Sequence, residues 1–428
     1  MPDLSCPSHL CISGIKSQID MEPDRSYLAP MKARTLLPRL HELAGQFPVI
    51  FLTGPRQSGK TTLCRHAFPV YRYISLEDLQ NRREAVEDPR AFLERLEGLP
   101  GTILDEAQHT PDLFSYIQGF VDERRSGPII MTGSQNFLLL DRISQSLAGR
   151  VAVMELFPFS LAELCDRPPA DPGSFETVAQ TTVGRPKPDL DTLLYQGLYP
   201  PIHDRQLSAT DWLDGYVRTY VERDVRSVSN IGSLEVFTRF LALCAGRSGQ
   251  LLNATSLASD AGVDATTVKR WISVLQAGYV LHLVRPHHQN FSKRLVKSPK
   301  LYFLDPGLMC HLLGIRGPRD LVTHPLRGAV VETFVYTELL KLHNNHGPRR
   351  DISFWRDSNG REVDFLIDRG GRQLPIEVKA GKTIARDFFK GLDHYLALAG
   401  DSQGVLIYGG DESYRRSGHL VKPWWAIS

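Results

Sequence analysis

The segment 54–61 constrains this chain more than any other, because it reads GPRQSGKT and fits the pattern G-x-x-x-x-G-K-S/T. The apolar run 48–53 before it predicts a buried strand, and residues 61–68 after it predict a short helix. In that setting backbone N–H groups point at phosphate oxygens, and glycines let the backbone approach them. The pattern therefore predicts a phosphate-binding loop. The alternative is a glycine-containing turn that matches by chance.

Side-chain chemistry assigns roles within this loop. Lys60 is expected to reach the β- and γ-phosphates of a nucleotide, and the Thr61 hydroxyl is expected to ligate Mg²⁺. Arg56 is a further candidate for a contact with the nucleotide or with a neighbouring subunit. The full predicted nucleotide-binding set is Gly54, Pro55, Arg56, Gln57, Ser58, Gly59, Lys60, Thr61, Thr62 and Ser134.

Between residues 48 and 158 the chain alternates short apolar runs with helical patterns, which is typical of a parallel α/β sheet. The expected strands are 49–52, 71–76, 102–104, 129–131 and 151–156. A helix is expected over 34–45, beside the first strand. Because ligands bind at the carboxyl ends of parallel strands, the strand ends should face the phosphate-binding loop.

Two acids, Asp105 and Glu106, end the apolar run that begins at Gly101. Asp105 fits a Walker B carboxylate that holds Mg²⁺ through water, and Glu106 fits the base that orients an attacking water. The alternative is a solvated acidic pair in a turn after the strand.

Three further polar residues lie between the fourth and fifth apolar runs. Ser134 or Gln135 is expected to sense the γ-phosphate, with helix capping as the alternative. Arg150 ends the segment SLAGR and is predicted to stabilise charge at the γ-phosphate, in cis or from a neighbouring subunit. The alternative for Arg150 is a surface or DNA-facing position.

The middle of the chain has a helical pattern that follows a Pro- and Gly-rich linker, 166–192. Helices over 254–261 and 266–277, with an apolar run after them, predict a helix-turn-helix and then the wing of a winged helix. Lys269 and Arg270 give only a thin basic face, so protein docking stays open beside DNA recognition. The basic patches 291–294 and 297–300 are either phosphate contacts or solvated loop.

The last third of the chain predicts an amphipathic helix followed by mixed strands and a second helix. The expected elements are the helix 327–342, the strands 352–356, 362–368 and 374–380, the helix 385–400 and the strand 405–408. A glycine pair, Gly370-Gly371, joins two of these strands in a hairpin. Asp364 and Glu377 should therefore lie on adjacent antiparallel strands.

These acids predict a second site with hydrolytic chemistry. Lys379 shares a face with Glu377, because side chains on a strand alternate with a period of two. Asp364 and Glu377 can share a divalent cation, and Lys379 can orient a water for attack on a phosphodiester. Glu332 can add a metal ligand or position the lysine. The alternative is a charged, alternating strand without a site.

From residue 31 to the end, the chain resembles a prokaryotic family of AAA-type ATPases that ends in a PD-(D/E)xK nuclease-like domain. The residues that carry the resemblance are GPRQSGKTT (54–62), LDEAQ (104–108), TGS (132–134), SLAGR (146–150), YQGLYPP (195–201), TYVERDVR (219–226), GQLLN (249–253), RGAVVETFV (327–335), REVDFLI (361–367) and PIEVKAGK (375–382). The resemblance implies an α/β protein with an AAA-type P-loop sheet, a helical and winged-helix middle and a restriction-endonuclease-like end. ATP and Mg²⁺ are the expected cofactors, and DNA and a second copy of this chain are candidate partners.

The expected ranges are a disordered leader at 1–30, the ATPase domain at 31–165, the linker at 166–192, the helical and winged-helix region at 193–300 and the nuclease-like domain at 301–428. Met31 is an alternative start. A net charge of +2 excludes a global basic field. Six scattered cysteines indicate reduced thiols, and the chain has no apolar run of membrane-spanning length, so we expect a cytoplasmic protein that does not bind membranes.

Two hypotheses about function follow. In the first, a Mg²⁺-dependent ATPase couples its nucleotide state to a C-terminal nuclease-like, DNA-related domain. The predicted catalytic residues are Glu106, Arg150, Asp364, Glu377 and Lys379, and the predicted metal ligands are Thr61, Asp105, Glu332, Asp364 and Glu377. In the second, the chain is a nucleotide-dependent switch or scaffold whose nuclease-like fold cuts nothing.

Overall fold

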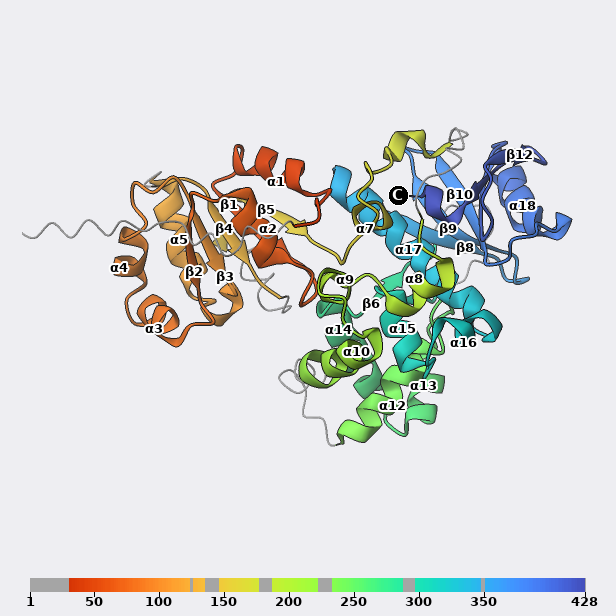
Figure 1. The fold of residues 1–428 in the computed structure, drawn as a ribbon, viewed down its shortest axis with the longest axis horizontal. Helices are drawn as coiled ribbons and strands as arrows, with labels where there is room; N and C mark the ends of the chain where they lie inside the picture. Colours follow the sequence, from red (N-terminus) through yellow and green to blue (C-terminus); the bar gives the residue numbers. More distant parts are fainter. Residues whose placement is uncertain are drawn as a thin grey trace, which may run out of the picture.

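The computed structural model describes residues 31–123, 126–134, 146–176, 187–221, 233–287, 297–347 and 351–427. An N-terminal α/β unit forms one end of the molecule (Figure 1). The chain leaves this unit after strand β5 and enters a larger body, where the middle helices and a C-terminal sheet lie together. The predicted leader, 1–30, lies outside the described residues, as do Gln135 and most of the charged segment 220–226.

The N-terminal unit is built on a five-stranded, fully parallel sheet with the order β2-β3-β4-β1-β5. Its strands are β1 (Val49–Thr53), β2 (Arg72–Ser75), β3 (Thr102–Asp105), β4 (Ile129–Thr132) and β5 (Val151–Glu155). Every residue of β1, β3 and β4 is buried, which explains why these strands read as continuous apolar runs. All five predicted strands, and their parallel arrangement, are confirmed.

Helices cover both faces of this sheet. They are α1 (Leu37–Ala44), α2 (Lys60–Ala67), α3 (Leu79–Glu87), α4 (Pro89–Glu94) and α5 (Leu113–Asp122). Alternate residues of β1 enter two separate cores: Ile50 and Leu52 pack in the core that contains α1 and α2, and Phe51 packs in the core that contains α5. The strands are thereby fixed in register, and the carboxyl ends of β1, β3 and β4 meet at one edge.

The middle of the chain is helical and contains a two-stranded antiparallel sheet. Its elements are α8 (Leu190–Gln196), α9 (Pro200–Asp204), α10 (Ala209–Tyr216), α12 (Leu234–Ala245), α13 (Ala254–Ala261), α14 (Ala265–Ala277), β6 (Leu281–Val284), β7 (Lys300–Phe303), α15 (Pro306–Leu312) and α16 (Pro318–Thr323). Gly262 ends α13 in the left-handed region, and the Asp264 side chain caps α14. The predicted helix–turn–helix and the strand after it are therefore present; their assignment as a winged helix stays a prediction.

Strand β7 falls at the start of the range predicted for the C-terminal domain, but it pairs with β6 instead. After it, the buried Asp305 carboxylate accepts hydrogen bonds from the backbone N–H groups of Leu308 (2.9 Å) and Leu198 (2.8 Å). These contacts join residues 300–312 to the middle helices. The packing thus favours a boundary between α16 and α17 rather than one at residue 300.

The C-terminal unit has a six-stranded mixed sheet with the order β12-β13-β11-β10-β9-β8. Its elements are α17 (Arg327–His346), β8 (Ile352–Arg356), β9 (Glu362–Asp368), β10 (Gln373–Lys379), α18 (Lys390–Ala399), β11 (Val405–Tyr408), β12 (Tyr414–Arg416) and β13 (His419–Pro423). The predicted order helix–strand–strand–strand–helix–strand is present, and β12 and β13 extend it. Within the described ranges, no helix is both long and apolar enough to cross a membrane.

Helix α17 differs from the predicted amphipathic helix. Every residue from 330 to 343 is buried except Glu332. A helix that is buried all round lies inside a structure rather than on its surface. The reason is that α17 contacts strand β10 of the C-terminal sheet, strand β7 of the middle and the segment that follows the N-terminal sheet. It is the central helix of the molecule.

Candidate nucleotide site and acidic cluster

Lys60 is the first residue of α2 and lies buried under the phosphate-binding loop, 6% exposed. Its ammonium donates hydrogen bonds to the backbone oxygens of Gly54 (3.0 Å) and Pro55 (2.8 Å). Burial lowers the pKa of Lys60 to about 8, although Glu106 and Asp105 oppose the shift. Helix α2 starts without a side-chain cap, which leaves its first N–H groups to a bound anion. The loop therefore has the strand–loop–helix setting that the sequence predicts.

The loop depends on glycine at position 54. Gly54 has φ of 142°, and a Cβ there would lie 2.2 Å from the backbone oxygen of Leu156. The loop thus packs closely against the backbone of Leu156, directly after β5.

We expect Gly54→Ala to lower the free energy of unfolding of the N-terminal unit by more than about 3 kcal/mol, since backbone strain and overpacking each cost about 1–3 kcal/mol. Gly98→Ala is the matched control, because Gly98 also has positive φ (70°) but a Cβ there meets nothing within 4 Å. Its cost should be only about 1–2 kcal/mol. Denaturant titration measures both. Equal losses would show that the contact with Leu156 is unimportant.

Asp105, at the end of β3, is the centre of the strand-end edge. Its buried carboxylate accepts hydrogen bonds from the hydroxyls of Thr61 (3.0 Å), Tyr73 (2.8 Å) and Thr132. Burial and the Asp105 charge raise the pKa of Tyr73, so its hydroxyl remains a donor. The sequence predicts that Thr61 and Asp105 both serve a Mg²⁺ ion, and the structure places the two side chains in contact. Sequence reasoning misses Tyr73 and Thr132, although Thr132 ends a strand next to β3 and could have been found by that position.

The backbone of Glu106 lies in the left-handed region, with φ of 56°, so the chain changes direction there after β3. Its carboxylate accepts a hydrogen bond from the Gln108 amide, which also lies 3.4 Å from the Ser134 hydroxyl. A non-glycine residue in this conformation stores strain, and such strain is common at functional sites. The structure therefore links the predicted base to the predicted sensor through Gln108, a residue that sequence reasoning left without a role.

These residues fit a nucleotide with Mg²⁺. A hydroxyl and a carboxylate, from Thr61 and Asp105, lie side by side and are the hard oxygen ligands that Mg²⁺ prefers. Ser58 Oγ and Gln108 Oε1 are two of several buried polar atoms without a hydrogen-bond partner among the described residues. Ser58 belongs to the loop and Gln108 contacts Glu106, so both residues are part of the predicted site.

Arg150 lies at the amino ends of the parallel strands, whereas the phosphate-binding loop lies at their carboxyl ends. It precedes β5, which runs parallel to β1, and its backbone oxygen accepts from the N–H of Val49 (3.3 Å). The length of β1, roughly 16 Å for a five-residue strand, thus separates Arg150 from the loop. Its guanidinium pairs with Asp122 at 2.6 Å. Contact in cis is excluded in this arrangement, and contact from a neighbouring subunit stays a proposal.

Arg34 ties the loop to the chain that leaves the sheet. Its buried guanidinium donates to the backbone oxygens of Ser58 (2.8 Å) and Phe157 (2.6 Å). It also forms an ion pair with Glu163, 3.2 Å away, on the short helix α7 (Leu161–Leu164). Arg34 thereby connects the loop with the segment 156–164.

The same segment is attached to α17, the neighbouring helix in Figure 1. The Glu338 carboxylate accepts from the N–H of Leu161 (2.9 Å), and the Lys341 ammonium donates to the oxygen of Phe159 (2.7 Å). Glu338 and Lys341 pair with each other at 3.0 Å and are both almost fully buried. Two buried ion pairs, Arg34–Glu163 and Glu338–Lys341, therefore connect the loop with the central helix through the backbone of the segment between them.

At the far side of α17, the structure brings the predicted acids together. Asp364 lies on β9 and Glu377 on β10, and both are buried. The Lys379 ammonium lies 2.6 Å from Glu377, and Asp364 accepts from the N–H of Val378 (2.8 Å). Burial, with the Asp364 charge, raises the pKa of Glu377 to about 8.

Lys300 is a further member of this cluster, and its position differs from the one that the sequence predicts. The sequence places it in an exposed basic patch, whereas its side chain is 2% exposed and faces Glu332, Glu362 and Asp364. It is buried because β7 carries it beneath α17. Burial, with the Asp364 charge, raises the pKa of Glu332 to about 7.

This cluster does not fit a divalent cation as it stands. Glu332, Asp364 and Glu377 have the right oxygen chemistry, but the ammonium groups of Lys300 and Lys379 already pair with them. Among the residues that the structure describes, no group of three or more His, Cys, Asp or Glu side chains is arranged to hold a metal.

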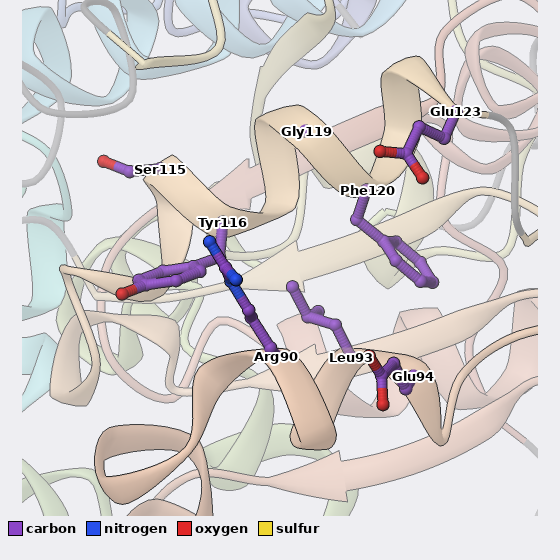
Figure 2. A pocket seen from close by; sticks show the side chains of 8 residues that line it. All are labelled: Arg90, Leu93, Glu94, Ser115, Tyr116, Gly119, Phe120 and Glu123. Atoms are coloured by element: carbon purple, nitrogen blue, oxygen red, sulfur yellow. The ribbon is translucent and has the colours of Figure 1, made fainter.

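A surface hollow of about 590 Å³ lies apart from both sites, between α4 and α5. Figure 2 shows Leu93 and Phe120 pointing between the two helices, with Arg90 beside Tyr116 at its rim. The hollow shares no residue with the phosphate-binding loop or with the acidic cluster.

The parallel sheet, the loop and the acids at the strand ends define an AAA-type P-loop ATPase domain. Residues 46–165 match a family model described as an AAA domain. Residues 187–319 and 327–427 match two domains of unknown function, DUF8612 and DUF4143.

The chain is 31% identical over 400 residues to the uncharacterized protein Rv2008c of Mycobacterium tuberculosis, which covers 91% of this chain and 83% of that protein. The uncharacterized protein Mb2031c of Mycobacterium bovis matches to the same extent. This chain belongs to the same family as these two mycobacterial proteins. An uncharacterized protein of Haemophilus influenzae is 20% identical over 354 residues, covering 76% of this chain and 81% of that protein.

Two solved structures are also similar. The Walker-type ATPase PABY2304 of Pyrococcus abyssi has a TM-score of 0.44 and 16% identity, covering 67% of this chain and 98% of that chain. The Thermotoga maritima RuvB Holliday junction branch migration motor has a TM-score of 0.30 and 18% identity, covering 59% and 89%.

Proposed function

We propose that this protein is a Mg²⁺-dependent ATPase that passes its nucleotide state to its C-terminal domain. The observation that carries the proposal is the contact of Thr61 with Asp105 beside the buried Lys60, with Glu106 one residue further on. These are the groups that bind phosphate, hold Mg²⁺ and orient water in P-loop ATPases.

Each residue has a defined task. Lys60 exchanges its contacts with the oxygens of Gly54 and Pro55 for phosphate oxygens, and the N–H groups at the start of α2 face the same phosphates. Thr61 and Asp105 hold Mg²⁺, which neutralises phosphate charge when it is bound. Glu106, positioned by Gln108, accepts the proton of the attacking water.

The buried charges between the loop and α17 support the coupling. When Lys60 leaves the oxygen of Gly54, the loop is free to shift against Leu156, which it now touches. Arg34 holds Ser58 and Phe157 together, so a shift of the loop acts on the segment that Glu338 and Lys341 fasten to α17. Packed elements respond to such shifts by switching between discrete arrangements.

The C-terminal domain has two candidate roles. A nuclease-like domain with DNA as partner is favoured by its element order and by its set of polar residues, Glu332, Asp364, Glu377 and Lys379. The ammonium of Lys300 among the acids favours the second role, a switch that cuts nothing in this state. Incubation with plasmid and Mg²⁺ or Mn²⁺ separates them: cleavage that Lys379→Ala abolishes supports a nuclease, and its absence supports the switch.

Removal of Mg²⁺ tests the proposed hydrolysis. With EDTA in excess, phosphate release from ATP should fall by at least about 100-fold, because metal ions contribute several kcal/mol to the stabilisation of developing charge. Added Mg²⁺ should restore the rate, as measured in a coupled phosphate assay. A rate that is indifferent to EDTA would contradict the assignment of Thr61 and Asp105 as the metal-holding pair.

A further inference from the structure

We propose that Lys300 is the resident cation of the acidic cluster and occupies the place where its carboxylates would otherwise hold a divalent metal. This inference does not depend on the proposed ATPase activity. It concerns only the contact between strand β7 of the middle region and the C-terminal unit.

The geometry around Lys300 resembles that of a bound cation. Its Nζ lies 3.3 Å from Glu332 Oε1 and 3.9 Å from Asp364 Oδ1, and it also contacts Glu362 Oε1. These carboxylates come from helix α17 and strand β9, so oxygens from two elements meet at one ammonium. The side chain of Lys300 is 2% exposed, which leaves water almost no part in its solvation.

The strand that carries Lys300 is fastened over the cluster. Tyr302, two residues along β7, donates its hydroxyl to Glu332 Oε1 at 2.5 Å. The backbone oxygen of Leu301 accepts from the N–H of Gly249 at 2.7 Å. Gly249 has positive φ (80°), and a Cβ there would lie 3.4 Å from the Glu332 carboxylate. The middle region therefore closes this side of the cluster with backbone as well as with the lysine.

The pairing of charges in the cluster supports the same conclusion. Four carboxylates, Glu332, Glu362, Asp364 and Glu377, face three cations, Lys300, Lys379 and Arg356. Buried charges are tolerated only when they are paired, and removal of one partner leaves the other uncompensated. Lys300 thus does for these acids what a metal would do, and it joins two parts of the chain in doing so.

Entry of a divalent cation then requires that Lys300 leaves. Lys300 is carried by β7 of the middle region, whereas its carboxylate partners lie on α17 and β9, so its departure removes the ion pairs that join these two parts of the chain. The cluster is therefore a latch between the middle region and the C-terminal unit, and a divalent cation competes with the latch.

The test is a titration of the full-length, nucleotide-free protein with Mn²⁺, followed by electron paramagnetic resonance. In the unmodified protein the cluster should not bind Mn²⁺, so Asp364→Asn should leave its Mn²⁺ binding unchanged. Lys300→Met should gain one Mn²⁺ site, and Asp364→Asn in that background should abolish it. Mn²⁺ should also raise the Tm of Lys300→Met, because a ligand that binds the folded state stabilises it. Lys297→Met, at an exposed lysine three residues earlier, should behave like the unmodified protein.

Two results would overturn the proposal. One is an unmodified protein that binds Mn²⁺ in a manner that Asp364→Asn removes. The other is a folded Lys300→Met protein that gains no Mn²⁺ site. If Lys300→Met does not fold, the comparison of the unmodified protein with Asp364→Asn decides alone. A Mn²⁺ site that is lost in Asp364→Asn refutes Lys300 as the resident cation. Equal Mn²⁺ binding in the two proteins supports it.

Discussion

Replacement of Lys60 by alanine should reduce ATP turnover by at least about 100-fold, the usual effect of losing one buried group that stabilises developing charge. The physical reason is that Lys60 is buried at the loop, so no exposed lysine can replace its ammonium. Steady-state phosphate release at saturating ATP measures the effect. The exposed Lys382→Ala is the matched control and should keep the full rate.

Glu106→Gln separates binding from chemistry at the same site. The amide has the size of the carboxylate but accepts no proton, so turnover should fall by at least about 100-fold while ATP still binds. Titration with a fluorescent ATP analogue should therefore give affinity close to that of the unmodified protein for Glu106→Gln and much weaker binding for Lys60→Ala. If both variants turn over ATP at the normal rate, the ATPase assignment is wrong.

Replacement of Glu338 by alanine should lower the free energy of unfolding by about 3–5 kcal/mol, because it leaves the buried Lys341 ammonium without its carboxylate. It also removes the acceptor of the Leu161 N–H. Denaturant titration measures the loss. Glu87→Ala is the control, since Glu87 pairs with Arg83 at 3.9 Å on an exposed helix face and its loss should cost less than about 1 kcal/mol.

The double variant Glu338→Leu with Lys341→Met provides the matching rescue. Apolar residues of similar volume often replace a buried ion pair without loss of stability. The double variant should therefore be more stable than Glu338→Ala, although it lacks both charges. If Glu338→Ala costs no more than Glu87→Ala, the pair does not fasten the segment 156–164 to α17.

Much of the nucleotide site is predictable from sequence because its signals are local. The loop lies within eight residues, and Asp105 ends a strand whose apolar run is visible, with Glu106 directly after it. A parallel sheet then brings the strand ends together without further information. Tyr73 and Thr132 escape prediction because a hydroxyl on a strand has many ordinary roles, and only the register of the sheet aims these two at Asp105.

The connection between the sites is not predictable in the same way. Arg34 and Phe157 are 123 residues apart, and Leu161 and Glu338 are 177 residues apart, so no periodic pattern links them. Lys300 is a clearer case, since the sequence KSPK looks like a solvated basic turn. Its burial depends on the placement of β7 against α17, which is a property of tertiary packing and not of local sequence.

Amide hydrogen exchange of the Glu106→Gln protein, measured with and without Mg²⁺ and ATP, tests the proposed coupling most directly. If nucleotide state reaches the C-terminal domain through Arg34 and Glu338, exchange should change in the loop, in the segment 156–164 and in α17. The same addition should change nothing in Lys60→Ala protein. Exchange that changes only around the loop, with the segment 156–164 and α17 unaffected, would contradict the coupling.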